Sequence, residues 1–138
     1  MKAYVLCGVI AVGVLVAAGG AAAHHSFAAE FDADQPITVT GIVTKIDWTN
    51  PHVWFYINVK DDKTDEITNW GAEMGPPHGL QRRGWRRETL KIGEEVTVEG
   101  SRAKNGSNRM NARRVTLTAT GGRPGETLDA VSSQRENP

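Results

Sequence analysis

The sequence has 138 residues, with 16 basic and 16 acidic side chains and one cysteine. Its length allows one domain with a modest hydrophobic core. The balanced charge excludes a general electrostatic attraction to nucleic acid or to anionic membranes.

The first 23 residues are typical of a secretory signal peptide. Lys2 precedes an uncharged apolar run that ends in three alanines, residues 21–23, which suit signal cleavage. The uncharged stretch 3–23 is also long enough for an uncleaved membrane anchor, but its glycines and its small-residue end favour cleavage. Cleavage removes Cys7, so the mature chain has no disulfide and no thiolate ligand. We expect a periplasmic or secreted protein, which meets the membrane only through this segment if it stays uncleaved.

The hydrophobic pattern after residue 36 alternates with period two, which predicts a mainly β domain over residues 37–118. Residues 24–36 form an N-terminal extension before it. Gly41 lies where the alternation in the first strand changes phase, and this predicts a β-bulge at the glycine. Five strands are expected, over residues 37–48, 52–60, 66–74, 95–102 and 110–118.

A short helix is expected between the third and fourth strands. Pro76-Pro77 suits its first turn, residues 78–83 continue it, and Gly84 ends it. Three strands, a helix and two strands form the order of a five-stranded OB-like barrel, whereas a β-sandwich needs about seven strands. Glycine, proline and polar residues prevail over residues 119–138, so this tail is expected to be disordered.

Two histidines follow the expected cleavage site, and each of two adjacent cuts predicts a copper site. A cut after Ala23 makes His24 the first residue, whose α-amine and Nδ1 chelate Cu(II) in a brace that also suits an oxidative copper enzyme. A cut after Ala22 places His25 third, where the amine, two amides and the imidazole form a square-planar set for Cu(II) or Ni(II). The alternative is a solvated terminal segment without a ligand.

A third histidine, His52, begins the second strand and shares a face with Trp54 and Tyr56. Antiparallel pairing of the second and third strands brings Glu73 to the same end of the sheet. Together with His24 and His25, these residues predict a divalent-metal site, for copper first and zinc second. The alternative for His52 is a polar residue on the outer face of the barrel.

Trp54 and Tyr56 also present an aromatic surface, and Arg83 and Arg86 belong to a basic cluster. These four residues predict contacts with a small anion or an envelope protein, although the arginines can equally form a solvated helix face. We find no motif of nucleophilic, phosphate-transferring or zinc-hydrolase catalysis. The sequence therefore favours a binding protein rather than an enzyme.

The elements HHSF, VTGIVTKIDWTNPHVW and LQRRGWRRETLKIGEEVTVEG resemble a family of small exported bacterial proteins described as a domain of unknown function. The resemblance covers about residues 24–118. It implies an exported OB-like barrel and supplies no activity and no catalytic residues. We therefore expect an exported protein that binds copper or zinc. The alternative is a metal-free interaction module for an envelope partner or a small anionic ligand.

Overall fold

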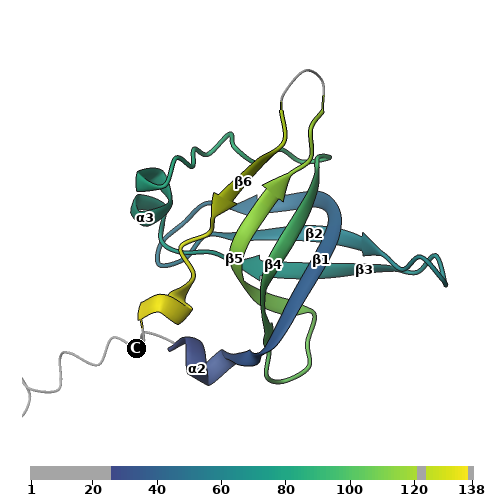
Figure 1. The fold of residues 1–138 in the computed structure, drawn as a ribbon, viewed down its shortest axis with the longest axis horizontal. Helices are drawn as coiled ribbons and strands as arrows, with labels where there is room; N and C mark the ends of the chain where they lie inside the picture. The colour runs from purple at the N-terminus through teal and green to yellow at the C-terminus, as the bar shows by residue number, and fades with distance from the viewer. Residues whose placement is uncertain (1–25, 121–123, 137–138) are drawn as a thin grey trace, which may run out of the picture.

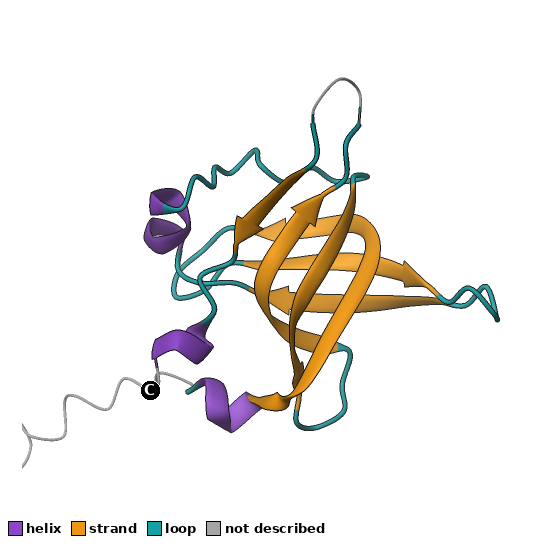
Figure 2. Ribbon diagram, in the orientation of Figure 1, coloured by secondary structure: helices purple, strands orange, loops and turns teal. Residues whose placement is uncertain are grey.

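One curved sheet of six strands and a few short helical segments make up the fold (Figures 1 and 2). The structure is a computed structural model, and it describes residues 26–120 and 124–136. The elements are α2 (Phe27–Glu30), β1 (Phe31–Asp47), β2 (Trp54–Lys60), β3 (Ile67–Glu73), α3 (Pro77–Arg82), β4 (Glu95–Ala103), β5 (Arg109–Leu117), β6 (Glu126–Asp129) and the 3-10 helix η1 (Ser133–Glu136).

Five of the strands close into a barrel-like ring. The order is β3-β2-β1-β4-β5, and a parallel pairing of β3 with β5 closes it, with Gly71 opposite Arg109. The other neighbouring strands pair antiparallel. The mainly β class is confirmed, as is the single short helix, α3, between β3 and β4.

The interior of the ring holds one hydrophobic core, built from the inward positions of each strand. Trp85 is fully buried, and its Nε1 donates a hydrogen bond to the Asp129 carbonyl at 2.8 Å. Trp48 is also buried. The largest fully buried side chains besides Trp85 include Phe31, Phe55, Ile57, Met74, Leu80 and Met110.

The phase change in β1 does not lie at Gly41, contrary to the prediction. The register against β2 shifts between Val43 and Lys45. Ile42 is 41% exposed and Val43 is buried, so the alternation still holds just beyond Gly41. Gly41 has a different role, because a Cβ there would lie 2.4 Å from the Asn58 carbonyl oxygen. The glycine therefore permits a close approach of two strands and not the bulge.

The first strand begins earlier than expected. Residues 27–30 of the predicted extension form α2, and β1 starts at Phe31, which pairs with Ala103. The expected signal peptide, residues 1–23, lies outside the described residues. Within residues 26–120 and 124–136, no helix combines the length and apolar character needed to cross a membrane.

The structure also differs from the predicted disordered tail. Residues 126–129 form β6, which pairs with β5, and η1 follows it. The segment is held by backbone bonds and burial: the Gly75 N–H donates to the Ala130 carbonyl at 2.9 Å, Ala130 is fully buried, and Leu128 packs on the core. A strand of four residues with one large apolar side chain has no hydrophobic period that would predict it from the sequence. It is stabilised by its pairing with the edge of β5.

Candidate functional site

His52 and Glu73 meet at the outer face of the ring, where β2 begins and β3 ends. The register pairs Trp54 with Glu73, and the Met74 N–H donates to the Val53 carbonyl at 2.8 Å. His52 Nδ1 lies 3.4 Å from Glu73 Oε1. The contact agrees with the strand pairing predicted from the sequence.

The Glu73 carboxylate is buried and takes part in a polar network that sequence reasoning missed. Asn111 Nδ2 donates to Glu73 Oε1 at 3.0 Å and lies 3.0 Å from Ser133 Oγ, while the Ser132 hydroxyl donates to Asn111 Oδ1. Asn111 has no exposed surface. It comes from β5, where the parallel register sets it opposite Glu73. The one available signal was a polar residue between the apolar Met110 and Ala112.

The N-terminal segment is anchored next to this network. Phe27 and Phe31 are buried, their ring centroids lie 5.9 Å apart, and they form a small cluster with Ala103 against which Trp54 packs. Lys104 fixes the same segment, because its Nζ donates to the Ala28 carbonyl at 2.6 Å. α2 also contacts η1 (Figure 1). The chain that follows His25 is therefore held beside Trp54, the strand partner of Glu73.

The predicted ligands His24 and His25 lie outside the described residues. Within residues 26–120 and 124–136, no group of three or more histidine, cysteine, aspartate or glutamate side chains is arranged to hold a metal ion. His52 and Glu73 supply two groups, whereas zinc sites in proteins use at least three protein ligands. His78, the remaining described histidine, is exposed on α3. A metal site at His52 therefore requires at least one ligand beyond these two groups.

The aromatic surface exists, but the chain's own cations cover part of it. The Arg109 guanidinium lies 4.5 Å from the centroid of the Trp54 ring, and Lys45 Nζ lies 5.2 Å from that of Tyr56. Lys45 also donates to the Asp47 carboxylate, and this hydrogen bond raises the pKa of the lysine above its ordinary value. These cation–π contacts leave the edges of the two rings, more than their faces, for a partner.

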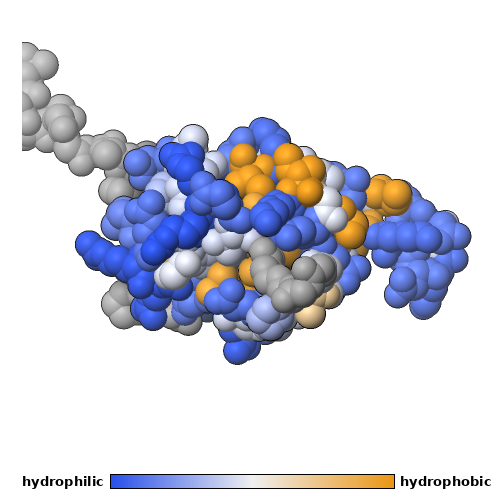
Figure 3. Space-filling model, turned by 90° about the horizontal axis from the view of Figure 1, so that it is seen from above, coloured by the Kyte–Doolittle hydropathy of each residue, from blue (hydrophilic) through white to orange (hydrophobic). Residues whose placement is uncertain are grey.

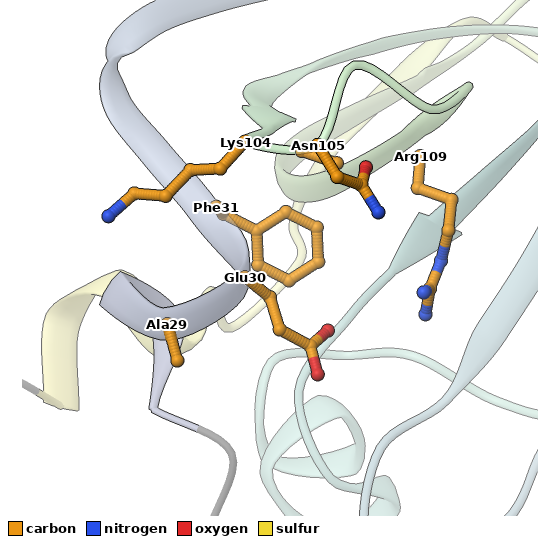
Figure 4. Close-up of a pocket in the computed structure, with 7 residues that line it drawn as sticks. Ala29, Glu30, Phe31, Lys104, Asn105 and Arg109 are labelled. Atoms are coloured by element: carbon orange, nitrogen blue, oxygen red, sulfur yellow. The ribbon is translucent and has the colours of Figure 1, made fainter.

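A pocket of about 270 Å³ adjoins this surface. It lies between α2 and the β4–β5 turn. Figure 4 shows the Glu30 carboxylate, the Asn105 amide and the Arg109 guanidinium around the Phe31 ring, while Lys104 points away. The pocket thus combines an aromatic wall with groups of both charge signs.

The predicted Arg83 and Arg86 lie in the segment that follows α3, in which Arg83 is the C-cap of the helix. Both are exposed. Arg86 Nη1 donates to the Trp85 carbonyl at 2.9 Å, and its main-chain N–H donates to Thr89 Oγ1 at 2.8 Å. The guanidinium of Arg86 is thus bound to neutral main-chain acceptors.

Comparison with protein families gives a match over residues 11–112, to a family described as a family of unknown function (DUF6152). The matched range contains every predicted site residue and Asn111, and it ends before β6 and η1. A search of curated proteins finds no match.

Proposed function

This chain belongs to DUF6152, a family of unknown function, and from that premise we propose a function based on the chemistry of its site. We propose that the protein is exported and reversibly binds a divalent metal ion, copper first and zinc second. The ligands are His52 and the N-terminal His24 and His25, with Glu73 beside them.

The observation that carries the proposal is the contact of His52 Nδ1 with the buried Glu73 carboxylate at 3.4 Å. Histidine ligands of metals commonly donate one ring N–H to a carboxylate, which fixes the ring and directs the other nitrogen to the ion. Glu73 is itself held by Asn111 Nδ2 at 3.0 Å. In this arrangement Glu73 orients His52, and His52 Nε2 is the coordinating atom.

The anchoring of α2 supplies the second argument. Phe27 is packed in the cluster that includes Trp54, and only Ser26 separates it from His25. Two residues of chain span up to about 7 Å, so the chain itself keeps His25 within this distance of Phe27.

The ligands that the chain terminus supplies distinguish copper from zinc. An α-amine and an imidazole from one residue suit the tetragonal geometry of Cu(II), whereas separate imidazoles in a tetrahedral set suit Zn(II). Protonation of imidazoles, about pH 6.5 for an ordinary histidine, competes with either ion. Affinity is therefore expected to fall as the pH is lowered through this range.

Calorimetry of the exported protein with Cu(II) and Zn(II) tests the proposal. His52→Ala and the double variant His24→Ala/His25→Ala should each lower the affinity, and Glu73→Gln should lower it by roughly 10- to 100-fold. His78→Ala is the matched control, because this histidine is exposed on α3. Equal affinities in the wild type, the double variant and His52→Ala would refute the site. Mass spectrometry of the N-terminus then assigns the copper geometry, since a start at His24 gives the brace and a start at Ala23 gives the third-position site.

The second candidate is a metal-free interaction module that uses the surface of Trp54 and Tyr56 for an envelope partner or a small anion. It is favoured by Gly71, which has no side chain to fill the space between the two rings. A Cβ at this position would lie 3.3 Å from Tyr56 and 3.5 Å from Trp54. In this case Trp54→Ala abolishes partner binding in a pull-down and a chelator has no effect.

A further inference from the structure

The segment from α3 to β4 is strongly basic within a chain of zero net charge. Residues 82–94 contain five basic and two acidic side chains. All five basic side chains are exposed. We call them the basic cluster, and its members are Arg82, Arg83, Arg86, Arg87 and Lys91.

Among the described residues, the arginines of the cluster are not paired with carboxylates. In the part of the chain that the structure describes, none of the four arginines forms an ion pair, in contrast to Arg114, which binds Glu99 at 2.9 Å. The guanidinium of Arg87 donates to the Trp48 carbonyl at 3.4 Å, so it has a neutral acceptor, as Arg86 does. Neutral acceptors position a guanidinium and leave its charge available to an outside anion.

The cluster is held in place by the core. Leu80 and Trp85, which alternate with the arginines, are fully buried, and Gly84 turns the chain at a φ of 94°. The positive groups therefore stand on a segment whose backbone is anchored to the core.

An exposed apolar tip ends the same segment. Ile92 is 70% exposed at a turn that Gly93 closes with a φ of 91°. The turn is tied to β1, because the Gly93 N–H donates to the Val43 carbonyl at 2.8 Å, and the neighbouring Ile42 is 41% exposed. Figure 3, which views the molecule from above, shows that hydrophobic residues gather next to strongly hydrophilic ones on its surface.

We propose that the segment 82–94 docks on the surface of an anionic phospholipid bilayer. The arginines of the basic cluster then bind lipid phosphates, and Ile92 inserts between the headgroups. Guanidinium groups match phosphate oxygens in a bidentate geometry, and each basic residue of a cluster adds to its attraction to an anionic membrane. The apolar tip decides between a bilayer and an acidic protein. An isoleucine that projects from a turn fits the headgroup boundary of a bilayer, whereas an acidic protein would need a shaped apolar pocket to receive it. The inference is independent of metal binding.

Co-sedimentation of the full chain with phosphatidylglycerol-containing vesicles and with pure phosphatidylcholine vesicles tests the docking. Any binding through the apolar N-terminal run is common to both lipids, so the difference between them reports the basic cluster. The double variant Arg83→Glu/Arg86→Glu should lower the phosphatidylglycerol-dependent binding by about 30-fold or more. High salt should lower it in the wild type, and Ile92→Ser should weaken it several-fold at constant charge.

The matched control is Arg113→Glu/Arg114→Glu, which makes the same charge change on two exposed arginines of β5 and should leave binding unchanged. Equal binding of the wild type to both vesicle types would overturn the proposal. So would an equal loss in the control variant, because the effect would then be one of net charge. Loss of binding to an acidic protein in the Arg83/Arg86 variant, without a lipid difference, would assign the face to a protein partner instead.

Discussion

Removal of the Asn111 side chain tests whether the buried polar network holds the tail against the ring. In Asn111→Ala, the hydrogen bond to the Glu73 carboxylate and those with Ser132 and Ser133 are lost. A bond to a charged acceptor is worth about 2 kcal/mol and each neutral one about 1 kcal/mol, so the free energy of unfolding should fall by about 4 kcal/mol. A domain of this size loses on the order of 15 °C in Tm for that change.

The assay is urea and thermal unfolding followed by tryptophan fluorescence, with Asn108→Ala as the control. Asn108 is exposed just before β5, so its truncation should change the free energy of unfolding by less than about 0.5 kcal/mol. If Asn111→Ala costs less than about 1 kcal/mol, these bonds do not stabilise the fold as we argue. Lower metal affinity in Asn111→Ala at temperatures where the variant is folded would further support the orienting role of Glu73.

Three further predictions concern other parts of the fold. Gly41→Ala should destabilise the protein by about 1–3 kcal/mol, measured by urea unfolding, because its Cβ would lie 2.4 Å from the Asn58 carbonyl oxygen. Trp85→Phe should cost about 1–3 kcal/mol, since it removes the indole N–H that donates to the part-buried Asp129 carbonyl; a neutral result would show that water replaces the indole N–H. The pKa of Asp61 lies below its ordinary value because the main-chain N–H of Thr64 donates to it. Its stabilising contribution is therefore present above the ordinary pKa and is lost as the pH falls through the lowered one, and an NMR titration with an ordinary pKa would contradict this.

The sequence predicted the elements that have a periodic hydrophobic pattern. Alternation located the strands that close the ring, and the antiparallel register brought Glu73 to His52 because one hairpin fixes both ends. Glycine was ambiguous: Gly41 signals a close approach of strands as well as it signals a bulge, and the register of β1 shifts two residues beyond it, after Val43.

The missed features depend on contacts between segments that are distant in the sequence. β6 has no period of its own and is stable because the edge of β5 accepts it. Asn111 resembles an isolated polar residue until the parallel register with β3 gives it Glu73 as a partner. The position of β6 and of Asn111 in the sequence could not have assigned either role.

The contact between α2 and η1 brings the first and last described segments to one side of the ring. Nearby ends permit circular permutation. A short linker from η1 to α2, with new termini opened in the exposed 61–66 turn at the far tip of the β2–β3 hairpin, should give a chain that folds to the same ring. Such a permutant would carry purification tags at the far tip of the hairpin, away from His52.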